Sequence, residues 1–263
     1  MARNSILAEI LEDKRREVEE KKVSFPEERI LKQLPSGQAR RDFKAAVSQS
    51  RGINLIAELK KSSPSKGVLR DNFEPQDIAR IFENSGASAL SVVTEERFFQ
   101  GKLDYIKRVK EATLLPVLRK DFIIDAYQLY ESLYFGADAV LLIADILSEK
   151  DLKDFVRISE SLNIEPLVEV HTKESLIKAL ALDSVKIIGI NNRDLHNFRV
   201  DINTTVCLKN FIPQEKTVVS ESGISSYKDV MYLKSIGINA VLIGEVFMLA
   251  KDIGAKVKEV MGC

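Results

Sequence analysis

The chain has 263 residues, 45% of them hydrophobic, so it is long enough to bury a sizeable core. Its 39 Lys and Arg residues balance 39 Asp and Glu residues, which leaves no basic excess of the kind that binds nucleic acid. We therefore expect no nucleic-acid partner.

The cysteines and the N-terminus indicate the compartment. Cys207 and Cys263 are too few and too far apart for a disulfide framework or a zinc site, which fits a reducing environment. The charged N-terminus lacks the apolar core of a signal peptide, and no apolar run approaches the roughly 18 residues that span a membrane. These features predict a soluble, cytoplasmic protein without a membrane partner.

The first fifty residues differ in pattern from the rest. Apolar residues recur near helical spacing among many charges, at Ile6, Leu7, Ile10, Leu11 and Val18. This spacing predicts an amphipathic helix. We expect residues 1–50 to form a helical extension that packs on a catalytic barrel formed by residues 51–263, the two making one structural domain. A helix that binds a partner through its apolar face is the alternative.

From residue 53 onward, runs rich in Val, Ile and Leu alternate with charged amphipathic segments. The runs cover residues 53–59, 88–94, 115–121, 137–143, 164–170, 185–191, 216–222 and 238–244, and the helix-like segments cover 75–86, 103–113, 125–137, 148–163, 173–182, 203–211, 227–237 and 247–261. Nearly continuous apolar strands in such alternation are typical of parallel strands covered by helices on both faces. Eight units predict an α/β fold, a (β/α)8 TIM barrel with an N-terminal helical extension. A doubly wound sheet is the alternative, and the absence of a Gly-x-Gly-x-x-Gly turn after the first strand weakens it.

In five of these runs, an apolar or small residue is followed two positions later by a polar residue. The sets are Ile56 with Glu58 and Lys60, Leu118 with Lys120, Leu167 with Glu169, Gly189 with Asn191, and Val219 with Glu221. Residues two apart share one face of a strand. The pattern predicts a packed lower barrel and a polar mouth at the C-terminal ends of the strands, where barrel enzymes hold their active sites. One such residue alone would more often be a solvated strand end.

Two glycines suggest a phosphate site. Gly223 and Gly244 lie in the turns after the seventh and eighth strands, and barrel phosphate sites are typically built from these two loops. Backbone N–H groups there can bind an anion. A glycine after a strand is more often an ordinary turn, so the pair carries more weight than either glycine.

Several runs together resemble the indole-3-glycerol phosphate synthase family in order and spacing. They are "IAELKKSSPSKG", "SVVTEERFFQG", "LRKDFIID", "GADAVLLIA", "PLVEVHT", "IIGINNRDL", "VSESGIS" and "AVLIGE", and the resemblance covers nearly the whole chain. It implies a monomeric lyase of tryptophan biosynthesis that acts on 1-(2-carboxyphenylamino)-1-deoxyribulose 5-phosphate. The family closes the indole ring with release of carbon dioxide and water, and needs no metal or organic cofactor.

The resemblance also implies roles for single residues. Lys120 matches the general acid and Glu169 the general base, and we expect Lys60 to crowd Lys120 and lower its pKa. Glu58 matches a carboxylate that holds the lysines in position. Lys60 matches a residue associated with the substrate phosphate and, in some proposals, with the acid for dehydration, so the division of roles between Lys60 and Lys120 stays open. Asn191 and Ser222 complete the implied catalytic set.

The remaining matches concern substrate binding. Near the substrate carboxylate and the reacting atoms we expect Ser63, Asn191, Arg193 and Glu221, and around the aromatic ring Phe99, Phe122 and Leu141. The phosphate would bind near Lys60 on the amides around Ser222, Gly223, Gly244 and Glu245. Because an acid beside a phosphate would repel it, we expect the Glu245 side chain to turn away. We expect the segment after the first strand, residues 60–67, to act as a lid over the substrate.

Three alternative functions would place other demands on the strand ends. The related barrel enzyme phosphoribosylanthranilate isomerase would need a cysteine at the end of the first strand, where Glu58 and Lys60 stand instead. A Schiff-base aldolase would use Lys120 as a nucleophile. A phosphate sensor or scaffold without activity would bind but not turn over its ligand, and the polar set at the strand ends argues against it.

Overall fold

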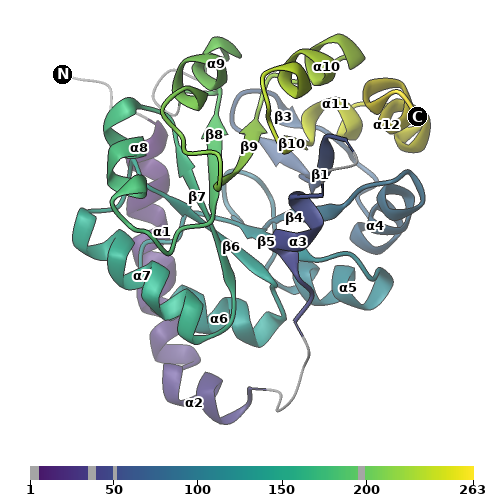
Figure 1. Cartoon of the computed structure of the whole chain (residues 1–263). Coiled ribbons are helices and arrows are strands. Elements are labelled where there is room, and N and C mark those ends of the chain that lie inside the picture. The colour runs from purple at the N-terminus through teal and green to yellow at the C-terminus, as the bar shows by residue number, and fades with distance from the viewer. Residues whose placement is uncertain (1–5, 35–39, 50–51, 195–198) are drawn as a thin grey trace, which may run out of the picture.

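Eight parallel strands form the centre of the molecule in a computed structural model that describes residues 6–34, 40–49, 52–194 and 199–263. They close into a barrel in the order β1-β10-β9-β8-β7-β6-β5-β4 (Figure 1). Their bounds are β1 Asn54–Leu59, β4 Ala89–Val93, β5 Val117–Lys120, β6 Ala139–Ile143, β7 Glu165–Val170, β8 Ile187–Asn191, β9 Thr217–Glu221 and β10 Ala240–Ile243. The predicted (β/α)8 TIM barrel is confirmed, and each predicted apolar run contains one strand.

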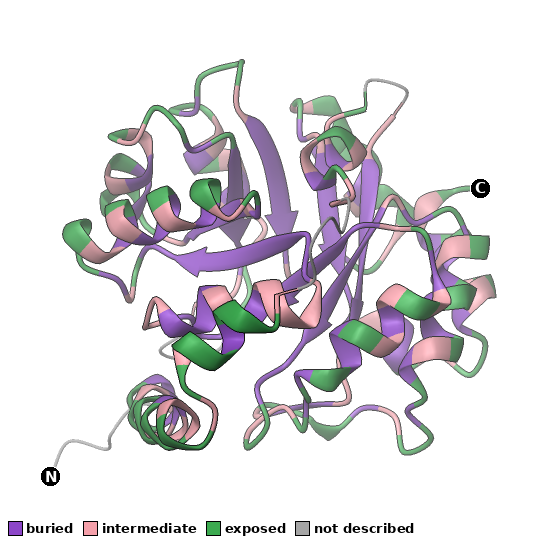
Figure 2. Cartoon of the chain, turned by 90° about the horizontal axis from the view of Figure 1, so that it is seen from below, coloured by how far each residue is buried: buried purple, intermediate pink, exposed green. Residues whose placement is uncertain are grey.

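Helices surround the barrel and bury their inner faces against it. They are α4 Pro75–Asn84, α5 Asp104–Ala112, α6 Tyr127–Phe135, α7 Glu149–Ser161, α8 Lys173–Leu180, α9 Asn203–Lys209, α10 Tyr227–Ser235 and α12 Ile253–Met261. Figure 2 shows the strands buried and the outer helices buried on the side that faces them. The apolar layer between strands and helices is the larger hydrophobic core.

The prediction of one helix over residues 247–261 was wrong. Two helices occupy this stretch, the short α11 (Glu245–Met248) and α12. The break has a local cause, because the Asp252 side chain accepts a hydrogen bond from the backbone N–H of Ala255 and so caps a new helix.

The loop after β1 contains a small hairpin that the sequence did not predict. β2 (Ser62–Ser63) pairs antiparallel with β3 (Gly67–Val68) outside the barrel. Gly67 has a φ of +66°, a conformation that glycine adopts without a steric penalty, and so permits the tight return of the chain. The expected lid segment is therefore a hairpin at the carboxyl end of β1.

A second hydrophobic core fills the barrel interior. Its strand residues include Ile56, Ala89, Leu118, Ala139, Leu167, Ile187, Val219 and Ala240, and it is separate from the layer under the helices. The helix α3 (Phe43–Val47) adds Phe43 and Val47 to this core and packs against β1 and β4. The packed lower barrel predicted from strand alternation is confirmed.

The N-terminal helices α1 (Ile6–Ser24) and α2 (Glu27–Lys32) lie along the barrel next to α6 (Figure 1). Leu7 and Ile10 of α1 join the interior core, whereas Val18 packs in a satellite cluster with Ile30 of α2 and Tyr127 of α6. The amphipathic helix predicted at the N-terminus is confirmed. The boundary at residue 50 between extension and barrel stays a prediction.

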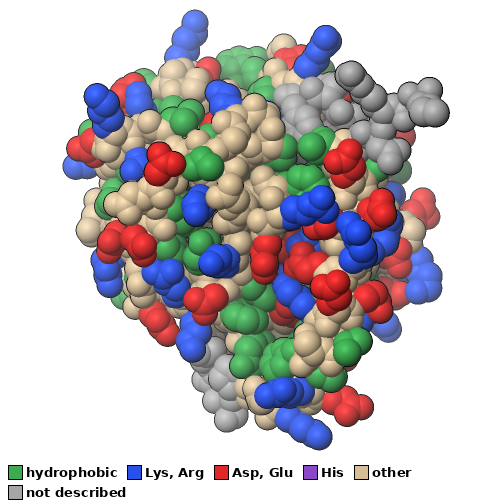
Figure 3. Space-filling view, turned by 180° about the vertical axis from the view of Figure 1, so that it is seen from behind, with side chains coloured by type: hydrophobic (Ala, Val, Ile, Leu, Met, Phe, Trp, Pro, Cys, Tyr) green, Lys and Arg blue, Asp and Glu red, His purple; other side chains and the backbone are tan. Residues whose placement is uncertain are grey.

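The surface is mixed in charge. On the face in Figure 3, acidic and basic side chains are interspersed rather than segregated. In the described part of the chain, every helix is too short or too polar to cross a bilayer.

The packing of α3 beneath the strands gives a stability prediction. Phe43 is 1% exposed, so Phe43→Ala leaves a cavity in the barrel interior and should lower the free energy of unfolding by about 3–5 kcal/mol. Leu114→Ala is the control, because Leu114 is 83% exposed and its loss should change stability by less than about 0.5 kcal/mol. Urea denaturation measures both. Equal effects would show that α3 adds nothing to the core.

Candidate active site

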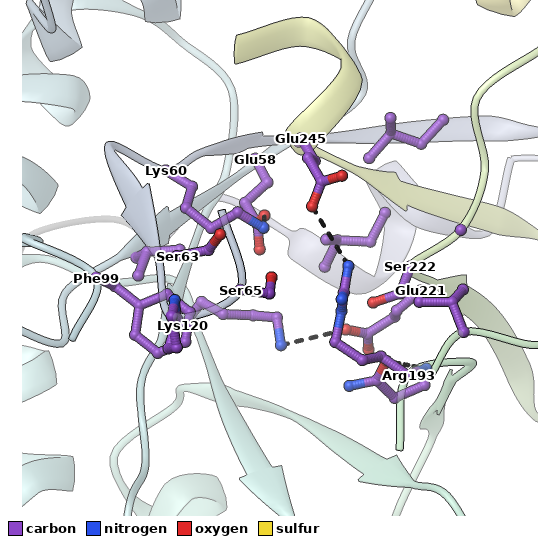
Figure 4. Close-up of a pocket in the computed structure, with 18 of the residues that line it drawn as sticks. Glu58, Lys60, Ser63, Ser65, Phe99, Lys120, Arg193, Glu221, Ser222 and Glu245 are labelled. Atoms are coloured by element: carbon purple, nitrogen blue, oxygen red, sulfur yellow. Dashed lines mark hydrogen bonds and ion pairs between the residues drawn. The ribbon is translucent and has the colours of Figure 1, made fainter. Parts of the chain in front are cut away.

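A cavity of about 680 Å³ opens at the carboxyl ends of the strands. Every residue that the sequence analysis assigned to the site lines it: Glu58, Lys60, Ser63, Phe99, Lys120, Phe122, Leu141, Glu169, Asn191, Arg193, Glu221, Ser222, Gly223, Gly244 and Glu245. Figure 4 shows the labelled side chains converging from strands and loops far apart in the chain. The fold therefore brings the expected set together in one pocket.

A lysine and two glutamates form the floor of the cavity. The Lys120 Nζ atom lies 2.9 Å from Glu169 Oε2 and 3.3 Å from Glu221 Oε2. The Asn191 side-chain amide donates to Glu169 Oε1 at 3.1 Å. Glu169 is thus held from both sides, with a proton donor in direct contact with a carboxylate that can accept a proton.

The pKa of Lys120 shifts in the direction opposite to the expectation. Burial acts to lower the pKa of this ammonium, but the negative charges of Glu169, Glu221 and Glu58 outweigh burial and raise the pKa above its ordinary value. The expectation that Lys60 lowers the pKa of Lys120 was wrong. Lys60 instead pairs with Glu58, at 2.6 Å between Nζ and Oε2, so its charge is largely compensated. Lys120 is accordingly a firmly protonated ammonium.

The pKa values of Glu58 and Glu221 shift in opposite directions. Burial raises the pKa of Glu58, but the charges of Lys60 and Lys120 outweigh it and the net shift is downward. Glu221 is 1% exposed, and burial together with the nearby charge of Glu169 raises its pKa to about 8 against the attraction of Lys120. The surroundings therefore favour the ionised form of Glu58 and the protonated form of Glu221.

Two glycines make room for these carboxyl groups. A methyl group on Gly189 would collide with Glu221 Oε1 and with the side chain of Leu167, and one on Gly244 would collide with the Glu58 carboxylate. Gly244 was expected only as a close approach to phosphate, and this steric need is an additional reason for glycine there. Ser222 and Gly223 have φ values of +68° and +77°, so the loop after β9 turns sharply at the cavity wall.

The Glu245 side chain does not turn away from the cavity, contrary to the expectation. Its Oε2 lies 3.3 Å from an Arg193 guanidinium nitrogen and its Oε1 lies 3.0 Å from Lys66 Nζ (Figure 4). Two cations attract it, one from the loop after β8 and one from the β2-β3 hairpin. Lys66 was not predicted as a site residue from the sequence, because only the hairpin brings this lysine opposite Glu245.

One wall of the cavity is apolar. The Phe99 and Phe122 rings have centroids 6.4 Å apart and are tilted by 42°, and Leu141 lies beside them on the lining. Leu7 and Ile10 of α1 complete this wall. The sequence analysis read these two residues only as the face of a covering helix. An aromatic ring fits such a wall, which also excludes water.

Comparisons with known proteins agree with one another. The family model described as indole-3-glycerol phosphate synthase matches residues 7–260. Indole-3-glycerol phosphate synthase from Thermoanaerobacter pseudethanolicus is 49% identical over 247 residues, 94% of each chain. The enzyme of that name from Legionella pneumophila strain Paris is 46% identical over 258 residues, 98% of this chain and 99% of the relative.

Solved structures of other proteins share the fold of this chain. A mutant tryptophan synthase alpha-subunit from Pyrococcus furiosus superposes with a TM-score of 0.61. The alignment covers 80% of this chain and 98% of that one, at 15% sequence identity. At this identity the match supports the barrel architecture alone.

The raised pKa of Glu221 predicts a pH-dependent stability. Between about pH 4.5 and pH 8 the folded protein holds a proton on Glu221 that the unfolded chain has lost, so this contribution to stability falls as the pH rises through that window. Glu221→Gln cannot titrate. The melting temperature of the variant minus that of the unaltered protein should therefore increase from pH 5 to pH 9 in thermal denaturation. Parallel curves would show that Glu221 titrates alike in both states.

Proposed function

This chain belongs to the indole-3-glycerol phosphate synthase family, and we propose that its barrel-mouth cavity performs the family reaction with Lys120 as acid and Glu169 as base. The reaction is the ring closure of 1-(2-carboxyphenylamino)-1-deoxyribulose 5-phosphate to indole-3-glycerol phosphate, carbon dioxide and water. The observation that carries the proposal is the 2.9 Å contact between Lys120 and Glu169 beneath an aromatic wall.

The first chemical step is formation of a carbon–carbon bond. The aromatic carbon that bears the carboxylate attacks the C2 carbonyl, and negative charge develops on the carbonyl oxygen. Lys120 donates a proton to this oxygen as the bond forms, and its high pKa in the cavity keeps the donor charged until that moment. Loss of carbon dioxide then returns an electron pair to the ring and restores its aromaticity.

Dehydration completes the indole. The C2 hydroxyl leaves as water after protonation by the Lys60 ammonium, or by Lys120 once solvent has returned the proton that Lys120 donated in the first step. Glu169 takes up the proton that C1 loses as the C1–C2 double bond forms. The Asn191 amide holds the Oε1 atom of Glu169 in place. Glu58 keeps the Lys60 ammonium beside the reacting atoms through their 2.6 Å ion pair.

The phosphate and the carboxylate of the substrate bind at separate subsites. The backbone N–H groups of the Ser222–Gly223 turn and of Gly244 and Glu245 face the phosphate, with Lys60 nearby. Arg193 and Ser63 receive the carboxylate, for which a guanidinium is well suited. Since Arg193 pairs with Glu245, the substrate carboxylate exchanges with or joins that pair.

The proposed function also bears on the oligomeric state and the compartment of the protein. All of these side chains come from one chain, which supports a site that is complete in a monomer. Membership of a biosynthetic enzyme family supports action in the cytoplasm on a small phosphorylated substrate. A Schiff-base aldolase is the weaker alternative, because a nucleophilic lysine needs a lowered pKa and that of Lys120 is raised.

Turnover without added metal tests the function. Purified protein and the carboxyphenylamino-deoxyribulose phosphate should yield a product with indole fluorescence, and a chelator should not abolish it. Loss of activity with the chelator, or trapping of the substrate on the protein by borohydride, would contradict this mechanism.

Two variants separate chemistry from binding. Lys120→Met removes the donor that acts in the transition state and should lower kcat by about 10²–10⁴ or more. Glu169→Gln keeps hydrogen bonding but cannot take up a proton, so kcat should also fall strongly. Affinity for a reduced, unreactive substrate analogue should fall far less in both. A Lys120→Met enzyme with near-normal turnover would transfer the acid role to Lys60.

A further inference from the structure

Buried carboxylates hold the backbone of both phenylalanines in the aromatic wall. Asp121 Oδ1 accepts the Phe122 N–H at 2.8 Å. Glu95 Oε2 accepts the N–H groups of Phe98 at 2.8 Å and Phe99 at 2.9 Å. Glu95 and Asp121 are 1% and 4% exposed. The two rings are thus placed by acceptors that have been removed from water.

A lysine from outside the barrel compensates these charges. Lys14 of α1 is 1% exposed, and its Nζ lies 3.0 Å from Asp121 Oδ1 and 2.6 Å from Glu17 Oε2. Burial raises the pKa of Glu95, and the N–H groups of Phe98 and Phe99 together with the positive charge of Lys14 act against this rise. Loss of Lys14 would leave Asp121 with Arg119 as its cationic partner, at 3.0 Å, and would remove a positive charge that acts on Glu95, so both buried carboxylates would shift toward the protonated form or move.

The contact is part of a closed ring of alternating charges between α1 and the barrel. From Asp121 it runs through Lys14, Glu17, Lys21, Glu131 and Arg119 and back to Asp121, with ion-pair distances of 3.0, 2.6, 2.7, 3.5, 2.9 and 3.0 Å. Asp121 is the member of this ring that lines the pocket, directly after Lys120, and Lys14 is its partner from α1. The ring therefore ties α1 to the carboxyl end of β5 and to α6.

We propose that Lys14 is a positioning residue for the aromatic subsite: through Asp121 and Glu95 it fixes the backbone of Phe122 and Phe99, and its helix supplies Leu7 and Ile10 to the same wall. The inference rests on the proposed function, since that function makes the wall the binding site of the substrate's carboxyphenyl group. Lys14 touches neither phosphate loop. Its loss should therefore weaken recognition of the aromatic ring and leave recognition of the phosphate intact.

The test compares two ligands on the full-length protein. The reduced substrate analogue carries both the ring and the phosphate, whereas ribitol 5-phosphate carries only the phosphate. Calorimetry on Lys14→Met should show roughly tenfold or greater loss of affinity for the analogue and less than about twofold for ribitol 5-phosphate. The KM for substrate should rise by more than kcat falls, and Lys14→Arg should recover part of the loss by keeping the charge.

Lys22→Met is the matched control. Lys22 also lies on α1 and pairs with the barrel, 2.7 Å from Asp125 Oδ2, but neither residue lines the cavity. This variant should keep both affinities within about twofold of the unaltered protein. An equal loss in the Lys14 and Lys22 variants would mean that α1 acts only through general stability, and would overturn the proposal.

A second variant keeps the proposal testable if Lys14→Met does not fold. Glu95→Ala acts from the barrel side and should show the same ligand-selective loss, because it removes the acceptor of the Phe98 and Phe99 N–H groups. Unchanged analogue affinity would overturn the proposal. Failure of the unaltered protein to turn over substrate would instead contradict the proposed function, so the two failures are distinguishable.

Discussion

The balance of charge around one buried ammonium organises the mouth of this barrel. Lys120 stands on the floor of the cavity within reach of Glu169 and Glu221, with Glu58 close enough to add to the same field. Glu169 and Glu221 contact this cation and Glu58 pairs with Lys60, so the surroundings favour the ionised form of Glu58 and the protonated form of Glu221. An ammonium and a carboxylate thus lie in contact on the floor, the pair to which we assign the acid and base roles.

The backbone supplies the space for this cluster. Two of the three carboxyl groups need a neighbour without a side chain, and Gly189 and Gly244 provide it for Glu221 and Glu58. Below the cluster, the interior core of the strands is closed by Phe43 and Val47 of α3. The charged layer therefore rests on a rigid apolar one, and the side chains on the floor have little freedom to rearrange.

The pocket is finished by elements outside the strands. Lys66 on the β2-β3 hairpin and Arg193 on the loop after β8 share the Glu245 carboxylate at the rim. On the opposite side, α1 brings Lys14 to Asp121 behind the aromatic wall. Polar contacts at the rim are partly exposed and can exchange with a substrate anion, whereas the Lys14 contact is buried and holds the wall in place. The two sides of the site thus differ in rigidity.

The sequence by itself determined the barrel and the members of the site. Period-two alternation dictates which face of a strand each residue occupies, so Glu58, Lys120, Glu169, Asn191 and Glu221 were assigned to the mouth from spacing alone, and the resemblance added the loop residues. Only the tertiary structure decided which of these side chains meet. The direction of the Lys120 pKa shift, the pairing of Glu245 with Lys66, and the place of Lys14 behind the wall all depend on contacts between segments far apart in the chain. Spacing defines a face but not the neighbours across it, and electrostatic shifts are set by those neighbours.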